Sequence, residues 1–267
     1  MAFGKTAPTP QAALPRFRRP LSPDEEAVCA RIDWARKPAH VAVIMDGNGR
    51  WARQRSLAER IEGHRAGAES VRAATRTAAE IGLRALTLYA FSSENWKRPR
   101  REVEALMHLL EDYLEGEIPE LMENNIRLVA SGRVADLPAS ARGKLARTMG
   151  ATAGNDGLVL NLALSYGGRQ EIVDAARALA RRAAAGDLDP DAIDEAAFAA
   201  ALYQPTLGDP ELLIRTSGEQ RLSNFLLWQS AYTEFVYLPV LWPDFTRLHF
   251  LQALIEYMGR DRRFGGL

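Results

Sequence analysis

Cysteine is nearly absent from this chain of 267 residues, since Cys29 is the only one. One thiol excludes an intrachain disulfide and a metal site made of several cysteines, and it fits a reducing compartment. Long apolar runs are also missing, because none approaches the roughly 20 residues needed to span a bilayer. The N-terminus lacks the apolar core of a signal peptide. We therefore expect a cytoplasmic protein.

The chain also lacks an excess of charge of either sign. Lys plus Arg and Asp plus Glu each number 34, so no overall field attracts nucleic acid, and any anion site must be local. We expect no nucleic-acid partner. Apolar residues make up 47% and charged residues 25%, which is an ordinary globular composition. The chain is long enough for a substantial core, and it shows neither an internal repeat nor an interdomain linker.

The first 23 residues differ in composition from the rest. They are rich in proline and carry a small arginine cluster, so we predict that residues 1–23 form a mobile tail and residues 24–267 form the catalytic domain. Ser22 is well placed as a helix N-cap, and Glu25 stands at the third helical position. We predict a short helix from there to about Ala35.

Short apolar runs alternate with amphipathic segments along the rest of the chain. The runs predict six strands, at about 40–45, 83–89, 126–130, 158–165, 212–216 and 234–238. Helical periodicity predicts helices at about 63–81, 102–121, 137–149, 171–185, 195–202 and 222–230, and a final one that Asp244 caps. This alternation favours a single α/β domain with a mainly parallel six-stranded sheet flanked by helices.

One turn combines several groups that suit a phosphorylated ligand. Asp46 follows the first strand, where open α/β sheets place their ligands. Gly47 and Gly49 let backbone N–H groups face an anion closely, and Arg50 offers a planar fork of donors for phosphate oxygens. The carboxylate could hold Mg²⁺. By residue type alone, an ordinary tight turn is the simpler interpretation, and neither a Walker loop nor a dinucleotide fingerprint is present.

Several stretches in order resemble the signature segments of the cis-prenyltransferases, a family that includes the bacterial undecaprenyl diphosphate synthases. They are His40–Ala52, Arg60–His64, Tyr89–Trp96, Ile214–Glu219, Arg221–Gln229 and Leu241–Phe245. The resemblance implies condensation of isopentenyl diphosphate with an allylic diphosphate such as farnesyl diphosphate. The product would be a long-chain polyprenyl diphosphate such as undecaprenyl diphosphate, the precursor of a cell-wall carrier lipid. It also implies Mg²⁺ as cofactor and a hydrophobic tunnel for the growing chain.

The resemblance assigns roles around the allylic substrate. Asp46 would be the central carboxylate, close to Mg²⁺, and Asn95 would support catalysis. The residues expected around the allylic diphosphate are Gly47, Asn48, Gly49, Arg50, Arg60 and His64. Ser92, Trp96 and Arg98 would belong to a mobile substrate loop. Trp51 would pack near the reacting end of the substrate, although its residue type suits the core equally well.

The same resemblance implies a second diphosphate pocket and a homodimer. Arg215, Arg221 and Ser223 match the positions that hold isopentenyl diphosphate, and the two arginines would converge from a strand end and a following helix start. Glu234 would be a second Mg²⁺-linked acid. Arg263-Phe264-Gly265 resembles a C-terminal element that reaches the neighbouring subunit's site, and Leu158 falls where the family has a bulky residue at the tunnel floor. The lipid product would bring transient contact with the membrane surface.

Three other functions deserve a comparison. A short-chain cis-prenyl diphosphate synthase would share nearly all of these motifs. A non-catalytic partner subunit of a heteromeric prenyltransferase would lose much of the Asp46–Arg50 signature, which is intact here. An aspartyl phosphohydrolase would need a second acid at the position of Asn48.

Overall fold

The sheet at the centre of the molecule is wholly parallel within the described part of the chain. The computed structural model describes residues 15–57 and 59–260. The strands lie in the order β3-β4-β2-β1-β5-β6, and each pairing is parallel. They are β1 His40–Ile44, β2 Ala85–Ser92, β3 Arg127–Ser131, β4 Val159–Tyr166, β5 Leu212–Arg215 and β6 Glu234–Tyr237. The predicted α/β fold with a mainly parallel sheet is confirmed.

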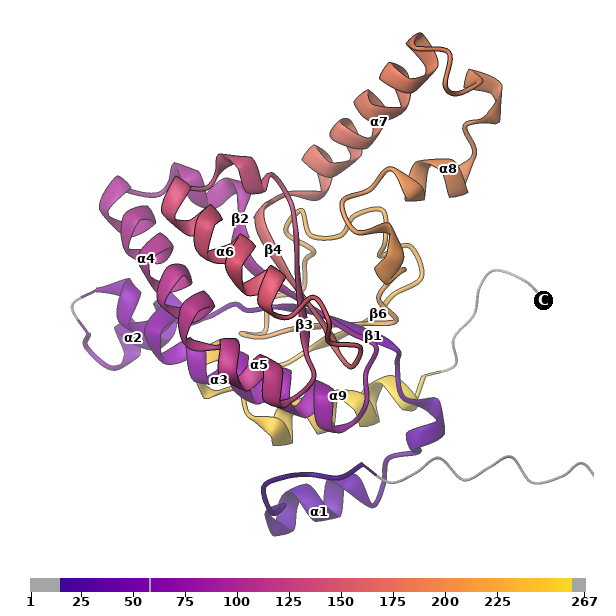
Figure 1. Cartoon of the computed structure of the whole chain (residues 1–267). Coiled ribbons are helices and arrows are strands. Elements are labelled where there is room, and N and C mark those ends of the chain that lie inside the picture. Colours follow the sequence, from indigo (N-terminus) through magenta and orange to yellow (C-terminus); the bar gives the residue numbers. More distant parts are fainter. Residues whose placement is uncertain (1–14, 58, 261–267) are drawn as a thin grey trace, which may run out of the picture.

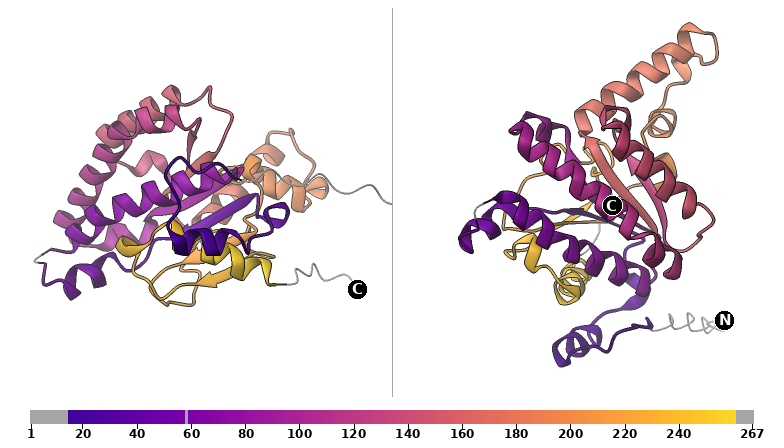
Figure 2. Two further views of the ribbon diagram at one scale, coloured as in Figure 1. Left: turned by 90° about the horizontal axis from the view of Figure 1, so that it is seen from below. Right: turned by 60° about the vertical axis from the view of Figure 1, so that its left-hand side comes forward.

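Helices cover the sheet and leave one pair projecting. Their bounds are α1 Pro23–Cys29, α2 Asn48–Gln54, α3 Arg60–Glu80, α4 Arg100–Gly116, α5 Ile118–Glu123, α6 Ala139–Ala151, α7 Gly168–Ala184, α8 Glu195–Ala200 and α9 Arg247–Met258. α3 packs against α4, α4 against α6, and α9 against α3 and β6 (Figure 1). α7 and α8 stand away from the body in Figure 1 and in the right-hand view of Figure 2.

The strand order explains where a ligand site is expected. From β1 the chain continues to β2 on one side, whereas β5 pairs with β1 on the other side. This reversal opens a crevice at the carboxyl ends of β1 and β5. β1 itself is buried at all five positions, as expected for a strand of a parallel sheet covered on both faces.

Three predicted helices have different limits in the structure. The predicted helix at 102–121 is two helices, α4 and α5, because Pro119 lacks the N–H that would continue the helical ladder. α1 ends at Cys29 rather than near Ala35. α9 begins after Thr246, whose side chain caps it in place of Asp244.

The segment 222–230 was predicted as a helix, and this prediction is wrong. Ser223, Asn224 and Leu226 have φ angles of 51°, 63° and 45°, which an α-helix excludes. Conversely, α2 was not predicted. Gly47, with φ of 110°, turns the chain directly into this helix.

The described part of the predicted tail, residues 15–22, is bonded to the body, whereas residues 1–14 lie outside the described residues. The Arg18 backbone N–H donates to Glu80, and its guanidinium donates to Glu123. Ser22 and Glu25 form the predicted capping box at α1. Within 15–57 and 59–260, no helix combines the length and the apolar character that crossing a bilayer requires.

A line of buried polar side chains crosses four strands of the sheet. His40 Nε2 lies 2.8 Å from Thr87 Oγ1, and Asn161 Nδ2 donates to the same oxygen at 3.2 Å. Ser131 Oγ donates to Asn161 Oδ1 at 2.9 Å, and His40 Nδ1 lies 3.1 Å from the Gly208 carbonyl oxygen. Burial lowers the pKa of His40 to about 4, although the Gly208 bond opposes this effect. His40 is therefore neutral in the folded protein.

The lowered pKa of His40 predicts a loss of stability in mild acid. Between about pH 6.5 and 4, His40 is protonated in the unfolded chain but stays neutral in the folded chain. The free energy of unfolding therefore falls as the pH falls. The full effect is roughly 3 kcal/mol. Urea unfolding of wild type and His40→Gln, from pH 7.5 to 4.5, should show a steeper decline for wild type. Parallel curves would contradict the assignment.

Candidate active site

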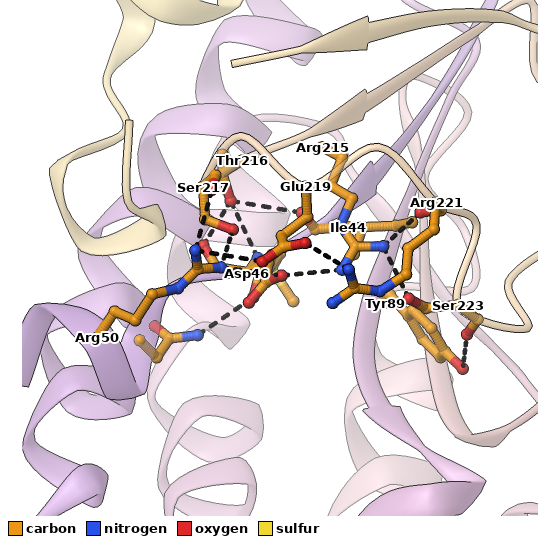
Figure 3. Close-up of polar contacts among 12 residues, drawn as sticks. Ile44, Asp46, Arg50, Tyr89, Arg215, Thr216, Ser217, Glu219, Arg221 and Ser223 are labelled. Atoms are coloured by element: carbon orange, nitrogen blue, oxygen red, sulfur yellow. Dashed lines mark hydrogen bonds and ion pairs between the residues drawn. The ribbon is translucent and has the colours of Figure 1, made fainter. Parts of the chain in front are cut away.

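Asp46 lies in the crevice between β1 and β5 and is held by two arginines. Arg215 Nη2 donates to Asp46 Oδ2 at 2.9 Å, and Arg50 Nη2 lies 3.4 Å from the same oxygen (Figure 3). The Asp46 backbone N–H donates to Thr216 Oγ1 at 2.9 Å. Burial raises the pKa of Asp46, but Arg215 and Arg50 outweigh it and hold the pKa below its ordinary value. The carboxylate is therefore ionised at neutral pH.

Arg215 joins Asp46 to the segment that follows β5. Its side chain is only 4% exposed. Nη1 donates to the Arg221 carbonyl oxygen and, at 2.7 Å, to Ser223 Oγ. Arg221 itself is 62% exposed and binds Glu219. The structure thus brings Arg215 and Ser223 together, as predicted. Ser223 lies in an irregular turn, however, and not at the start of a helix.

The glycines of the signature turn, Asp46–Arg50, stand where neighbouring atoms leave no room for a Cβ. A Cβ on Gly47 would lie 2.9 Å from Leu241 Cδ2, in addition to the strain of its positive φ. A Cβ on Gly49 would lie 2.7 Å from Arg60 Nε. Gly49 therefore leaves the space in which the Arg60 guanidinium approaches the turn.

α3 packs closely against Asn48 at two more glycines. A Cβ on Gly63 would lie 2.0 Å from the Asn48 carbonyl oxygen, and one on Gly67 would lie 2.6 Å from Asn48 Oδ1. Asn48 is buried, and its Nδ2 donates to the Met45 carbonyl oxygen at 3.2 Å. Asn48 Oδ1 and the neighbouring His64 Nε2 have no hydrogen-bond partner in the described structure. Burial lowers the pKa of His64 to about 4, and Arg98 and Arg60 add to this effect, so the imidazole is neutral.

The signature turn borders two hollows of opposite character. One, of about 230 Å³, is polar and is lined by Asp46, Gly47, Gly49, Arg50, Arg53, Arg60, Glu219 and Arg221. The other, of about 170 Å³, lies between α3, α4 and the sheet. Its polar wall is formed by Asn48, His64, Asn95 and Arg98, and most of the rest is apolar, including Val71, Leu88, Leu106, Leu110, Leu162 and Leu164. The turn therefore lies between a cationic hollow and an apolar cavity.

The loop after β2 contributes to the polar wall of the apolar cavity. It folds as a 3-10 turn at Ser93–Lys97, and Asn95 Oδ1 accepts the Ser92 backbone N–H at 3.0 Å. Arg98 pairs with Glu102 at 2.9 Å. Trp96 Nε1 donates to Ser165 Oγ at 2.9 Å, and its ring borders a separate groove outside α4 rather than the cavity.

Some of the site residues predicted from the sequence do not line either hollow. Trp51 lines neither, since its Nε1 donates to Asp244 Oδ1 at 2.8 Å. Glu234 pairs with Leu212 at the amino ends of the strands, at the opposite edge from Asp46, and its carboxylate binds Arg260 at 3.0 Å. Leu158 is buried in the core and is not part of the cavity wall. Arg263-Phe264-Gly265 lies outside the described residues.

Two acidic residues at the site were not predicted from the sequence. Glu219 binds Arg221 and lies 3.4 Å from Arg50 Nη1, so it bridges the two expected diphosphate pockets (Figure 3). Glu102 forms an ion pair with Arg98, and its carboxylate lies 3.8 Å from Arg60 Nε. In the described part of the chain, no three His, Cys, Asp or Glu side chains gather to hold a metal ion. A metal here would need ligands from substrate.

Substitution of Gly63 should separate α2 from α3. Gly63→Ala forces its new methyl group against the Asn48 carbonyl oxygen, and we expect a loss of about 1–3 kcal/mol in stability together with a loss of activity. Gly143→Ala is the matched control, because nothing lies within 4 Å of that position in α6. It should stabilise the protein by roughly 0.5–1 kcal/mol. Urea unfolding measures both, and equal effects would refute the packing argument.

Comparisons with known proteins converge on one family. The Prenyltransf family model, undecaprenyl diphosphate synthase, matches residues 44–265. The isoprenyl transferase of Bacillus subtilis (strain 168) is 54% identical over 230 residues, which cover 86% of this chain and 88% of the relative. The farnesyl-diphosphate-specific ditrans,polycis-undecaprenyl-diphosphate synthase of Micrococcus luteus is 47% identical over 236 residues, covering 88% and 94%.

A solved structure agrees with these sequence matches. The lavandulyl diphosphate synthase of Lavandula x intermedia, in complex with dimethylallyl diphosphate, aligns with a TM-score of 0.83 and 40% identity. The alignment covers 86% of this chain and 99% of that structure.

Proposed function

The chain belongs to the cis-prenyltransferase family of undecaprenyl diphosphate synthases, and on this premise we propose that it adds isopentenyl diphosphate units to farnesyl diphosphate to make undecaprenyl diphosphate. The product would be the precursor of a cell-wall carrier lipid. One observation carries this proposal: the turn at Asp46 borders both a cationic hollow and an apolar cavity. An allylic diphosphate has the same two parts, a dianionic or trianionic head and a hydrocarbon tail.

The cationic hollow suits the diphosphate of the allylic substrate. Arg50 and Arg60 face it with several N–H donors, and Gly47 and Gly49, although buried, line its wall without a side chain. Guanidinium groups bind phosphate oxygens through parallel hydrogen bonds. As negative charge develops on the leaving diphosphate, these fixed donors stabilise the transition state more than the ground state.

The residues present fit a magnesium ion bound together with substrate. Mg²⁺ dependence is general in this family, and Mg²⁺ is usually held by one or two carboxylates plus substrate phosphates. Asp46 is ionised and lines the hollow where those phosphates would lie. The ion would neutralise charge on the leaving diphosphate. Asp46 would hold it, and Arg215 would keep the carboxylate oriented.

Arg215, Arg221 and Ser223 would receive the diphosphate of isopentenyl diphosphate. Arg215 already binds Ser223, and the more exposed Arg221 reaches the hollow that Asp46 lines. In the condensation, the bond between allylic carbon 1 and oxygen breaks, carbon 4 of the isopentenyl unit bonds to that carbon, and carbon 2 loses a proton. Asn48, His64 and Asn95 are the polar groups that face the hydrocarbon side of this reaction. Ser92 and Trp96 would position the loop that carries Asn95.

We further propose a homodimer that makes transient contact with the membrane through its lipid product. Val173 and Tyr232 are 44% and 59% exposed, so both side chains are accessible to a second copy of the chain. Trp228, which lies in the same part of the chain, packs on Phe198 of α8 at 4.4 Å between ring centroids. A role for Glu234 in metal binding depends on this dimer, because within one chain it lies at the far edge of the sheet.

A product assay tests the function directly. Purified protein with farnesyl diphosphate, labelled isopentenyl diphosphate and Mg²⁺ should give a ladder that ends near the undecaprenyl length, and EDTA should abolish it. Asp46→Asn should lower turnover by about two orders of magnitude or more, because it removes a charge at the reacting centre. Asp112→Asn, on the exposed side of α4, should not.

Each other outcome of this assay has a definite meaning. One short addition would indicate a short-chain synthase, and no incorporation by folded protein would indicate a non-catalytic subunit. Equal activity of Asp46→Asn and wild type would remove Asp46 from the mechanism.

The two-pocket assignment predicts a split between the Michaelis constants. Arg221→Gln should raise KM for isopentenyl diphosphate by about 10-fold or more, and Arg60→Gln should do so for the allylic substrate, because each loses charged hydrogen bonds to one diphosphate. Arg127→Gln, at the start of β3, is the control for loss of a surface charge. Steady-state kinetics with each substrate varied in turn measures the split. If either variant affects both substrates equally, the pockets are not separate.

A further inference from the structure

We propose that the Ser217 hydroxyl is a positioning group, which holds Arg50 in place for the diphosphate of the allylic substrate. This inference rests on the proposed function, since it concerns how that diphosphate is bound. Ser217 lies just after β5, in the segment Ile214–Glu219. Two features of the molecule point to its role: the conformation of its backbone and the contacts of its side chain.

The backbone at Ser217 has a conformation that favours glycine. Its φ angle is 76°, and that of Gly218 is 73°, in the left-handed region where a Cβ is costly. Hydrogen bonds impose this turn, because the Ser217 N–H donates to the Val240 carbonyl oxygen at 2.7 Å and the Gly218 N–H donates to the Leu238 carbonyl oxygen at 2.8 Å. Glycine would satisfy the backbone better, so strain at this position indicates a function for the serine side chain.

The contacts of Ser217 supply that function. Arg50 Nη2 donates to Ser217 Oγ, and Arg50 Nη1 donates to the Ser217 carbonyl oxygen at 3.1 Å (Figure 3). Ser217 is buried, so water competes little for these bonds. An Oγ that accepts from a cation keeps its own proton to donate, and a hydrogen bond from Ser217 contributes to the lowered pKa of Asp46. The hydroxyl therefore lies between a guanidinium and a carboxylate and binds both.

Arg50 depends on Ser217 because its other contacts are longer. The Arg50 side chain is 35% exposed, and the carboxylates of Asp46 and Glu219 each lie 3.4 Å from its guanidinium. Arg215, by contrast, is buried and binds Asp46 directly at 2.9 Å. A long side chain that is free before binding must lose rotamer freedom when it binds, which weakens binding. Removal of the hydroxyl should therefore loosen Arg50 and leave Arg215 in place.

Binding of farnesyl diphosphate tests the role of the hydroxyl. With Mg²⁺ present but without isopentenyl diphosphate no condensation occurs, and titration calorimetry then gives the dissociation constant. Ser217→Ala and Ser217→Gly should each raise this constant about 10-fold, because Arg50 loses a charged hydrogen bond. KM for isopentenyl diphosphate, at saturating farnesyl diphosphate, should stay within about 2-fold, because the contacts of Arg215 are independent of the change.

The two substitutions should differ in stability although they agree in binding. Both remove the hydroxyl, but only glycine adopts the φ angle of this position without strain. Ser217→Gly should therefore unfold at a higher urea concentration than Ser217→Ala. A merely structural role would instead make affinity follow stability, so that the glycine variant would bind farnesyl diphosphate better than the alanine variant.

Two further variants test whether Ser217 acts through Arg50. Ser56→Gly is the matched control, since Ser56 also has a positive φ, of 55°, but is exposed and lines neither hollow. It should bind farnesyl diphosphate as wild type does. The double variant with Arg50→Gln and Ser217→Gly should bind no more weakly than Arg50→Gln alone, because a group that acts through Arg50 has nothing left to position.

The outcomes separate this inference from the function on which it rests. Wild-type affinity in both Ser217 variants would overturn it. A further loss of affinity in the double variant, beyond that of Arg50→Gln, would overturn it too, as would affinity that follows the urea midpoint. If Ser217→Ala does not fold, Ser217→Gly alone gives the binding test. A folded wild-type protein that does not bind farnesyl diphosphate would instead reject the proposed function.

Discussion

The ion pair between the buried Arg215 and the partly buried Asp46 is the interaction on which the site depends. Arg215 ends β5 and Asp46 follows β1, so the pair spans the point where the strand order reverses. An unpaired guanidinium or carboxylate there would be costly, because each is removed from water. Mutual neutralisation therefore fixes the geometry of the crevice. The same arginine binds Ser223 and the Arg221 carbonyl oxygen, so the carboxylate and the second phosphate pocket are positioned by one side chain.

The signature turn separates two kinds of chemistry because its residues alternate in direction. Asp46, Gly47 and Gly49 face the cationic hollow, whereas Met45 and Asn48 face the apolar cavity. This arrangement requires close contact between α2 and α3, which Gly63 and Gly67 permit. A substrate with a charged head and a hydrocarbon tail can then be held with its reactive carbon at the turn. Asn48 Oδ1 and His64 Nε2, both without a partner in the described structure, are polar groups available at that junction.

The sequence predicted the parallel sheet and the clustering at Asp46, because buried strands and glycine turns leave local signals. It failed at 222–230, where Leu222, Phe225 and Leu226 have helical spacing. Periodicity reports which residues are buried, and here the burial is achieved by an irregular turn in which Phe225 stacks on Tyr89. α2 was missed because packing on α3, rather than an apolar face of its own, holds it. Glu219 and Glu102 were missed because the partners of a charge are decided by tertiary structure.

The carboxylates of Glu219 and Glu102 affect how the arginines bind a diphosphate. Every arginine that the proposal gives to a diphosphate is already near a carboxylate. Arg50 is near Asp46 and Glu219, and Arg215 is bound to Asp46. Arg221 is bound to Glu219, and Arg60 is near Glu102. The carboxylates hold the guanidinium groups in the crevice before substrate arrives, so less ordering remains to be done on binding. A diphosphate must replace these contacts, and its net gain is smaller than for unpaired arginines. An enzyme that repeats one condensation many times benefits from this restraint, because the diphosphate released at each step must also leave.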